Sequence, residues 1–352
     1  MDTPMPAARR LPAEWEPQDG VMLTWPHDRS DWLPWLAEVE PVYVALARAV
    51  TARERLLVCV RDEAHRAHVA ALLAAGRVPA TRVALHVAPS NDSWARDHGP
   101  ITVVDGGRPR LLDFVFNGWG GKYEAGLDDR ITAELARQGA FGATERERVE
   151  FVLEGGGIES DGAGTLLTTA ACLLSPGRNP SFSRAAIEQR LGELFGLQRV
   201  LWLEHGALEG DDTDSHIDTL ARFCDAGTIA YVRCDDRGDA HFAALEAMER
   251  ELRALRDARC EPYRLVPLPW PAAKHGRDGR RLPATYANFL VINGAVLAPT
   301  YRDPADAEAL ARLAACFPGR EIVAIDCLPL IQQYGSLHCI TMQLPAGTMA
   351  PV

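Results

Sequence analysis

The chain has 352 residues and a net charge of −11 at pH 7, and 47% of its residues are hydrophobic against 24% charged. This balance is typical of a globular protein, and the acidic charge argues against a nucleic-acid partner, because nucleic acid requires a basic face. No stretch is long and apolar enough for a membrane span or a signal peptide, so we interpret the eight cysteines as free thiols of a cytoplasmic protein.

One pattern recurs along the chain: a strand, a tight turn with glycine and a second strand. It covers residues 101–114, 158–169, 219–232 and 288–301, with turn glycines at positions 106, 162, 227 and 294. Asp-Gly and Asn-Gly turns between β-branched residues favour hairpins, since both turn positions need positive φ. A fifth unit is predicted to be split between residues 19–26 and 338–345, whose pairing would close a ring of repeats.

Helical stretches are expected between the hairpins. They cover Val39–Arg55, Asp62–Ala75, Asp128–Arg137, Ser183–Leu194, Ala240–Asp257 and Asp306–Ala315. The segment Pro267–Pro283 is rich in Pro, Gly and Arg and is interpreted as a surface loop. Strands that alternate with helices indicate the α/β class, and because no linker divides the chain, residues 1–352 are expected to form a single domain.

Ionisable residues precede the turn glycines at similar distances. Asp97 comes 9 residues before its turn glycine, Glu154 comes 8, Asp218 comes 9 and His216 comes 11. In a ring of similar hairpins, equal distances from the turn place side chains at the same height along the axis. The spacing therefore predicts that these four groups converge at the centre of the ring.

Each of these segments also has a plainer interpretation. The loop around Asp97 (NDSWARDHGP) is typical of a solvated turn, and Gly155–Gly157 after Glu154 could serve an ordinary turn instead of a close backbone approach. His216 and Asp218 before a hydrophobic strand favour function, because burying them unpaired is costly. A metal site is disfavoured, since the chain has no HxH, HExxH or CxxC motif.

Cys339 differs from the other cysteines in its position. It opens a strand, follows Tyr334-Gly335-Ser336 and stands next to His338. A thiol at the mouth of a strand beside charged groups can be activated, whereas a thiol in mid-core usually acts as a small hydrophobe. Together with a distant histidine and carboxylates, Cys339 fits the pattern of a thiol nucleophile with a base and an orienting group.

Seven segments resemble, in order, the signatures of the agmatine deiminase family, which belongs with the bacterial peptidyl-arginine deiminases in the guanidine-modifying superfamily. They are LPAEWEPQDGVMLTWP, NDSWARDHGP, FNGWGGKY, LEGGGIESDGAGTLLTT, LEGDDTDSHIDTLARF, LPATYANFLVINGAVLAPTY and GSLHCITMQLP, and they extend from Leu11 to Pro345. The resemblance implies a five-bladed, pseudo-symmetric α/β-propeller of ββαβ units with the active site on its axis.

The resemblance also implies roles for the candidate residues. Cys339 would be the nucleophile and His216 the general acid and base, while Asp97 and Asp218 would grip the guanidinium and Glu154 would orient His216. The reaction would convert agmatine to N-carbamoylputrescine and ammonia through a thiouronium intermediate on the cysteine. No metal and no organic cofactor are implied.

The tail of the substrate needs partners of its own. We expect Asp212 to receive the agmatine ammonium and Trp94 to line the methylene channel; the plainer interpretation makes them a solvated turn residue and a core residue. The sequence leaves open a deiminase of free or peptidyl arginine, an amidinotransferase and a non-enzymatic binding propeller. It also leaves open a homo-oligomer.

Overall fold

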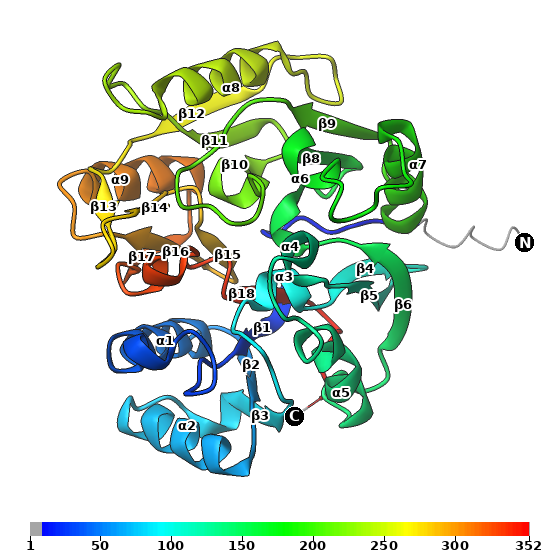
Figure 1. Ribbon diagram of the computed structural model, residues 1–352. Helices are drawn as coiled ribbons and strands as arrows, with labels where there is room; N and C mark the ends of the chain where they lie inside the picture. The colour runs from blue at the N-terminus through cyan, green and yellow to red at the C-terminus, as the bar shows by residue number, and fades with distance from the viewer. Residues whose placement is uncertain (1–8, 352) are drawn as a thin grey trace, which may run out of the picture.

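The computed structural model describes residues 9–351 and has the mixed α/β class predicted from the sequence (Figure 1). Its three- and four-stranded sheets share one order, in which the first two strands are antiparallel and the third is parallel to the second. Figure 1 shows the longer helices at the periphery of the molecule and α3 near its middle.

Each of these sheets takes its strands from one stretch of the chain, except that the four-stranded sheet combines both ends. The strands are β18 (Thr341–Pro345), β1 (Gln18–Thr24), β2 (Arg55–Val60) and β3 (Val83–Val87); β4 (Ile101–Asp105), β5 (Arg108–Val115) and β6 (Glu145–Val152); β7 (Ile158–Ser160), β8 (Thr165–Thr169) and β9 (Arg199–Leu203); β10 (Ala221–Asp225), β11 (Thr228–Val232) and β12 (Arg264–Leu268); and β15 (Leu290–Ile292), β16 (Ala295–Thr300) and β17 (Glu321–Asp326).

The predicted helices are all present, with ends shifted by a few residues. They are α1 (Leu36–Thr51), α2 (Glu63–Ala75), α5 (Ile131–Arg137), α7 (Arg184–Phe195), α8 (Phe242–Ala254) and α9 (Asp306–Cys316). Shorter helical turns are α3 (Ala95–His98), α4 (Gly118–Gly121), α6 (Ala170–Leu173), η1 (Leu33–Trp35), η2 (Ala80–Arg82), η3 (Asp128–Arg130), η4 (Gly155–Gly157), η5 (Ile217–Thr219) and η6 (Leu330–Gln333).

The hairpin prediction is confirmed in all five places. The pairs β4–β5, β7–β8, β10–β11 and β15–β16 are antiparallel across the predicted glycine turns. The split unit also pairs as predicted, because β1 runs antiparallel to β18 with Met22 opposite Met342. Two segments that are far apart in sequence therefore belong to one sheet.

The segment Pro267–Pro283 was expected to be a loop, and this is wrong in part. Pro267 lies in β12, and β13 (Lys274–His275) pairs with β14 (Arg281–Leu282) as a small antiparallel hairpin. Strands of two residues are too short to leave a hydrophobic period in the sequence. Gly279, at a φ of +79°, allows the tight turn between them.

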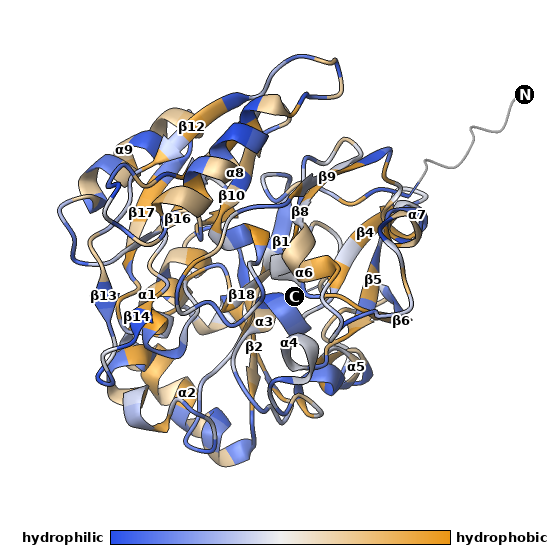
Figure 2. Cartoon of the chain, turned by 45° about the horizontal axis from the view of Figure 1, so that its top comes forward, coloured by the Kyte–Doolittle hydropathy of each residue, from blue (hydrophilic) through white to orange (hydrophobic). Residues whose placement is uncertain are grey.

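Apolar faces of the helices pack against the sheets. Leu245, Met248 and Leu252 of α8 are buried at helical spacing, while Glu246, Arg250 and Arg253 of the same helix are exposed. Figure 2 shows this division as mixed hydrophilic and hydrophobic segments in α8 and α9, next to largely hydrophobic strands such as β17. Among the helices of residues 9–351, none combines the length and the apolar character needed to cross a membrane.

Candidate active site

The predicted catalytic residues all lie directly before the first strand of a sheet. Asp97 lies in α3 before β4, Glu154 precedes η4 and β7, His216 and Asp218 are at η5 before β10, and Cys339 precedes β18. The turn η4 contacts both α3 and η5, and α3 also contacts β18. The convergence predicted from the spacing is therefore present, and all five side chains are buried.

His216 lies between two carboxylates. Its Nδ1 is 3.7 Å from Oδ1 of Asp97, and its Nε2 is 3.9 Å from Oε2 of Glu154. Burial would lower the pKa of His216, but Asp97 and the neighbouring Cys172 and Glu154 outweigh it and raise this pKa well above its usual value. His216 is therefore held as an imidazolium, the form that can give a proton to a leaving group.

The glycines after Glu154 serve a close approach of the backbone and not an ordinary turn. A Cβ on Gly156 would lie 2.5 Å from Nδ1 of His216 and 2.9 Å from Oδ1 of Asp97. The backbone N–H of Gly156 donates to the same Asp97 oxygen at 3.0 Å. Only glycine leaves room for the imidazole and the carboxylate to meet over this turn.

Arg178 fixes Glu154 in the interior. Its Nε donates to both carboxylate oxygens of Glu154, at 3.0 and 2.8 Å, and both side chains are fully buried. Burial would raise the pKa of Glu154, yet His216 and Arg178 lower it below the usual value. Glu154 is thus a buried anion whose position is set by Arg178 and whose charge faces His216.

Cys339 lies between Asp218 and Asn288. Its Sγ is 3.8 Å from Oδ2 of Asp218 and 3.4 Å from Oδ1 of Asn288. Oδ1 of Asn288 also accepts from the backbone N–H of His338 at 2.8 Å, and Nδ2 of Asn288 donates to the carbonyl of Asp218 at 3.3 Å. Asn288 therefore joins Cys339 to the carboxylate beside it.

Besides Glu154, three further acidic groups of the site have shifted pKa values. Burial raises the pKa of Asp97 to about 6, with Asp218 and Glu154 adding to the shift and His216 opposing it. Burial, Asp218 and Asp97 raise the pKa of the Cys339 thiol well above its usual value. Burial would raise the pKa of Asp218 as well, but contacts with His338 and His216 lower it. The resting site thus combines carboxylates with a protonated thiol, an arrangement that favours a cationic ligand.

The front cavity, as we call the pocket at Cys339, opens from these residues to the surface. Trp94, Asp97, Trp119, Tyr123, Asp211, Asp212, Tyr334 and Cys339 are among the residues that line it. Asp212 accepts a 2.7 Å hydrogen bond from the hydroxyl of Tyr123, which orients its carboxylate. Trp94 packs against Trp32 with ring centroids 5.6 Å apart, and the backbone of Gly335 covers its ring.

A cluster of possible metal ligands is present in the site. The ligand atoms of Glu154, Cys172 and His216 lie within 4.8 Å of one another. Arg178 already donates to both oxygens of Glu154, and His216 is held protonated, so a cation would have to displace a proton beside a fixed positive charge. This arrangement suits an acid–base residue better than a metal ligand.

Several residues of the site were not identified from the sequence. Asn288, Arg178 and Trp119, whose Nε1 donates to Asp97 at 2.9 Å, all contact predicted catalytic residues. The repeat offered a signal for Asn288, because it precedes β15 as Asp97 precedes β4 and Cys339 precedes β18. Arg178 lies in a loop outside the repeat, and no local pattern marks it.

The chain has full-length relatives. Residues 10–345 match the family described as Porphyromonas-type peptidyl-arginine deiminase. The agmatine deiminase of Pseudomonas aeruginosa (strain LESB58) is 34% identical over 375 residues, which cover 99% of this chain and 98% of the relative.

Solved structures agree in fold. A substrate-bound cysteine-to-serine variant of C. jejuni agmatine deiminase is 36% identical, with a TM-score of 0.88 and 96% of both chains covered. A Porphyromonas gingivalis protein, provisionally named an arginine deiminase, is 52% identical, with a TM-score of 0.91, and 97% of this chain and 100% of that chain are covered.

Proposed function

Because the chain belongs to the Porphyromonas-type peptidyl-arginine deiminase family, we propose that its front cavity hydrolyses agmatine to N-carbamoylputrescine and ammonia. The observation that carries this proposal is that Asp97 and Cys339 line the same cavity, with Asp218 3.8 Å from the thiol and a protonated His216 3.7 Å from Asp97. A planar cation bound by two carboxylates would present its central carbon to the thiol.

The proposed architecture is a five-bladed α/β-propeller formed by a single domain. The shared strand order of the sheets and the position of a helix between the second and third strands support a ββαβ blade. The pairing of β1 with β18 supports a closed ring, because it joins the first and last blade segments in one sheet. The free cysteines support a cytoplasmic location.

The proposed reaction begins when the guanidinium enters between Asp97 and Asp218. Oδ1 of Asp218 is buried and, within the described residues, has no hydrogen-bond partner, so it is available to a guanidinium N–H. The positive charge of the ligand offsets the two carboxylates that raise the pKa of Cys339. Binding therefore favours the thiolate, which attacks the central carbon and forms a C–S bond.

His216 completes both halves of the reaction. As an imidazolium it protonates the departing ammonia, which leaves a thiouronium adduct on Cys339. Neutral His216 then takes a proton from a water molecule as this water attacks the adduct, and the C–S bond breaks to release the urea product. Glu154 and Arg178 hold His216 in place throughout. No step in this route uses a metal or an organic cofactor.

The acidic lining of the front cavity favours agmatine over arginine. Among the described lining residues there are five aspartates, Asp31, Asp92, Asp97, Asp211 and Asp212, and neither Lys nor Arg. An ammonium tail is attracted by such a lining, whereas the α-carboxylate of arginine is repelled. Asp212 is the proposed partner of the ammonium and Trp94 lines the methylene channel.

The test is ammonia release from agmatine, free arginine and a blocked arginine peptide, measured side by side. We expect agmatine to be hydrolysed with the highest kcat/KM. Preference for arginine or the peptide would assign the substrate class suggested by the Porphyromonas gingivalis relative instead. Transfer of the amidino group to an added amine would indicate an amidinotransferase, and no ammonia from any of the three would favour a non-enzymatic binding role.

A further inference from the structure

The lining of the front cavity divides into a buried floor and a rim that solvent reaches. The floor includes the buried residues Trp94, Trp119 and Cys339, and the exposed or partly exposed rim includes Asp31, Tyr123, Asp211, Asp212, Thr213, Gln333, Tyr334 and Gly335. These rim residues come from four segments that are far apart in sequence. The width of the entrance therefore depends on what holds the four segments together.

One hairpin contacts three of these segments or their direct neighbours. It consists of β13 and β14, and we call it the rim hairpin (residues 274–282). Figure 2 shows both strands beside α1. The guanidinium of Arg277 lies 4.1 Å from the ring centroid of Trp35, just after the first rim segment. A Cβ on Gly210, which directly precedes the rim aspartates, would lie 2.4 Å from the carbonyl oxygen of Arg281.

The third contact joins Arg280 to Tyr334. Nη1 of Arg280 donates to the Tyr334 hydroxyl at 2.9 Å, and the guanidinium carbon lies 4.7 Å from the centroid of the same ring. Tyr334 has a φ of +68°, a left-handed conformation that a bulky residue keeps only where its surroundings hold it. A Cβ on Gly335 would lie 2.1 Å from the Trp94 ring, so the Tyr334 segment lies directly on the proposed methylene channel.

Arg280 and Tyr334 also lie close to the proposed ammonium site. Burial, Asp212 and Tyr334 raise the pKa of the Tyr123 hydroxyl, and Arg280 opposes this shift. Such electrostatic effects weaken with distance and with screening by solvent. The contact between Arg280 and Tyr334 is therefore next to the hydrogen bond between Tyr123 and Asp212, where the tail of the substrate would leave the cavity.

The base of the rim hairpin is fixed more firmly than its tip. Lys274 and Arg281, one in each strand, form ion pairs of 2.8 and 2.6 Å with aspartates outside the hairpin. Arg280 at the tip is exposed, and cation–π contacts at exposed sites are weak. A substitution of Arg280 should therefore release Tyr334 and leave the base of the hairpin in place.

We propose that Arg280, through Tyr334, sets the width of the entrance to the front cavity and thereby selects guanidines with a slim, unbranched tail over guanidines on a peptide. This inference rests on the proposed function, which supplies the reaction. Arg280 is a positioning residue, because it acts through Tyr334 and is not among the described residues that line the cavity.

The two classes of substrate differ at the entrance. The tail of agmatine is a chain of four methylenes that ends in an ammonium, whereas the α-carbon of a peptidyl arginine carries backbone on both sides. A tyrosine ring held at the rim obstructs the branched tail and leaves room for the slim one. Release of the ring should therefore change the preference between the two classes and not only the rate.

The experiment compares kcat/KM for ammonia release from a blocked arginine peptide with that from agmatine, using the full-length enzyme. In Arg280→Ala we expect the ratio of the peptide value to the agmatine value to rise about tenfold or more over wild type. Charge alone predicts the opposite, because losing a positive charge near the rim favours agmatine, which has two charges, over the peptide, which has one. A rise of the ratio therefore reports the width of the entrance.

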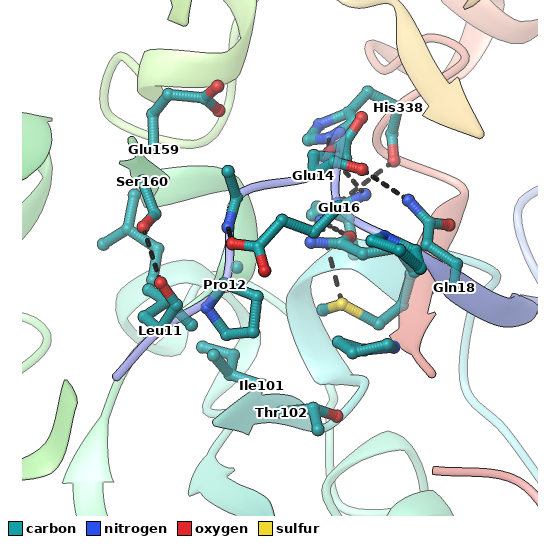
Figure 3. Close-up of a pocket in the computed structure, with 18 residues that line it drawn as sticks. Leu11, Pro12, Glu14, Glu16, Gln18, Ile101, Thr102, Glu159, Ser160 and His338 are labelled. Atoms are coloured by element: carbon teal, nitrogen blue, oxygen red, sulfur yellow. Dashed lines mark hydrogen bonds and ion pairs between the residues drawn. The ribbon is translucent and has the colours of Figure 1, made fainter. Parts of the chain in front are cut away.

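Further variants separate this contact from a general loosening of the fold. Tyr334→Phe keeps the ring and loses the hydroxyl that accepts from the arginine, and should raise the same ratio by a smaller factor. Arg184→Ala is the matched control, since its guanidinium also lies 4.7 Å from an aromatic ring, that of Trp202, and neither residue lines the front cavity. Arg10→Ala is a second control: Arg10 binds Glu16 at 2.6 Å beside the pocket drawn in Figure 3, whose described lining shares no residue with the front cavity. Both controls should keep the wild-type ratio.

A second measurement does not depend on turnover. N-ethylmaleimide and a maleimide that carries pyrene are both uncharged and differ in size. Peptide mass analysis separates their reaction at Cys339 from that at the exposed Cys260. The rate at which the pyrene reagent labels Cys339, relative to the small reagent, should rise in Arg280→Ala over wild type.

The outcomes of these experiments are distinct. A substrate ratio that is unchanged or lower in Arg280→Ala, or wild-type enzyme that hydrolyses the peptide as well as agmatine, would overturn the selection by Arg280. An unchanged labelling ratio would overturn the widening of the entrance. If Arg280→Ala does not fold, Tyr334→Phe tests the same contact by both measurements. Absence of ammonia from every guanidine would overturn the proposed function, and the labelling ratio would still decide whether Arg280 sets the width.

Discussion

The front cavity and the cluster of Glu14, Arg96, Glu159 and Arg222, which we call the rear cluster, both contain carboxylates, but only the rear cluster pairs them with arginines. In the rear, Arg222 binds Glu14 at 3.0 Å and Glu159 at 2.6 Å, and Arg96 lies 3.6 Å from Glu14, so positive charges neutralise the carboxylates. In the front, Asp97 lines a cavity whose described lining carries no Lys or Arg, and Asp218 lies 3.8 Å from Sγ of Cys339 in the same lining. The comparison indicates that the rear carboxylates are neutralised by partners within the fold, whereas the front carboxylates have no such partner, as the proposed binding of a cationic substrate requires.

The largest expected effect is a loss of activity when a carboxylate of the front cavity is removed. Asp97→Asn keeps the shape of the side chain but removes a negative charge at the guanidinium, so kcat/KM for agmatine should fall by roughly 10²–10⁴-fold. Because burial disfavours the charged form of Asp97, the variant should unfold at the same urea concentration as wild type or a higher one. A clear loss of stability with little loss of activity would assign Asp97 a structural role.

A substitution at Arg222, among the charges behind the front cavity, should instead lower the free energy of unfolding. Arg222 is fully buried and binds Glu14, Glu159 and the carbonyl of Phe289. Arg222→Met would leave two buried carboxylates without their main partner, which should lower the free energy of unfolding by about 3–5 kcal/mol. Urea denaturation measures this loss. The control is Arg250→Met in the exposed pair with Glu246, where a change above about 0.5 kcal/mol would question the contrast between buried and exposed pairs.

A smaller effect is expected at the entrance of the front cavity. Asp212→Asn should raise the KM of agmatine about tenfold, since Asp212 is only half-buried and solvent screens its charge. A guanidine with the same alkyl chain but no amine should be affected much less. Tyr123→Phe removes the hydrogen bond to Asp212 but not its charge and serves as the control. An equal rise of KM for both substrates would mean that Asp212 supports His216. An unchanged KM for both would mean that Asp212 is a surface residue without a part in substrate binding.

The smallest expected effect is the dependence of kcat/KM for agmatine on pH. Asp97 has a raised pKa of about 6 in the free enzyme, so below that pH it is protonated and can no longer hold the guanidinium. The kcat/KM for agmatine should therefore fall about tenfold per pH unit below pH 6, while kcat should change less, because the bound cation keeps Asp97 ionised. Asp92 also has a pKa of about 6, and Asp92→Asn is the matched control. If kcat/KM of this variant no longer fell below pH 6, the group that titrates would be Asp92 and not Asp97.

The parts of the fold that could be predicted from the sequence have local causes. Turn glycines and β-branched flanks marked the hairpins, and similar spacings before those turns marked Asp97, Glu154, His216 and Asp218. The contacts that the sequence did not reveal are long-range. His338 and Glu14 are 324 positions apart and meet only because β1 pairs with β18. No pattern in either segment indicates the other, so their contact follows only from the long-range pairing of β1 with β18.

The central claim is that Cys339 forms the covalent adduct in the front cavity. Acid quenching of the wild-type enzyme during turnover of agmatine, followed by peptide mass analysis, tests this directly. We expect the peptide that contains Cys339 to gain the mass of agmatine less one ammonia. The sharpest competitor is Cys172, which lies next to His216 on the side of Glu154. An adduct on Cys172 or on any other cysteine, or turnover without an adduct in Cys339→Ser, would contradict the account.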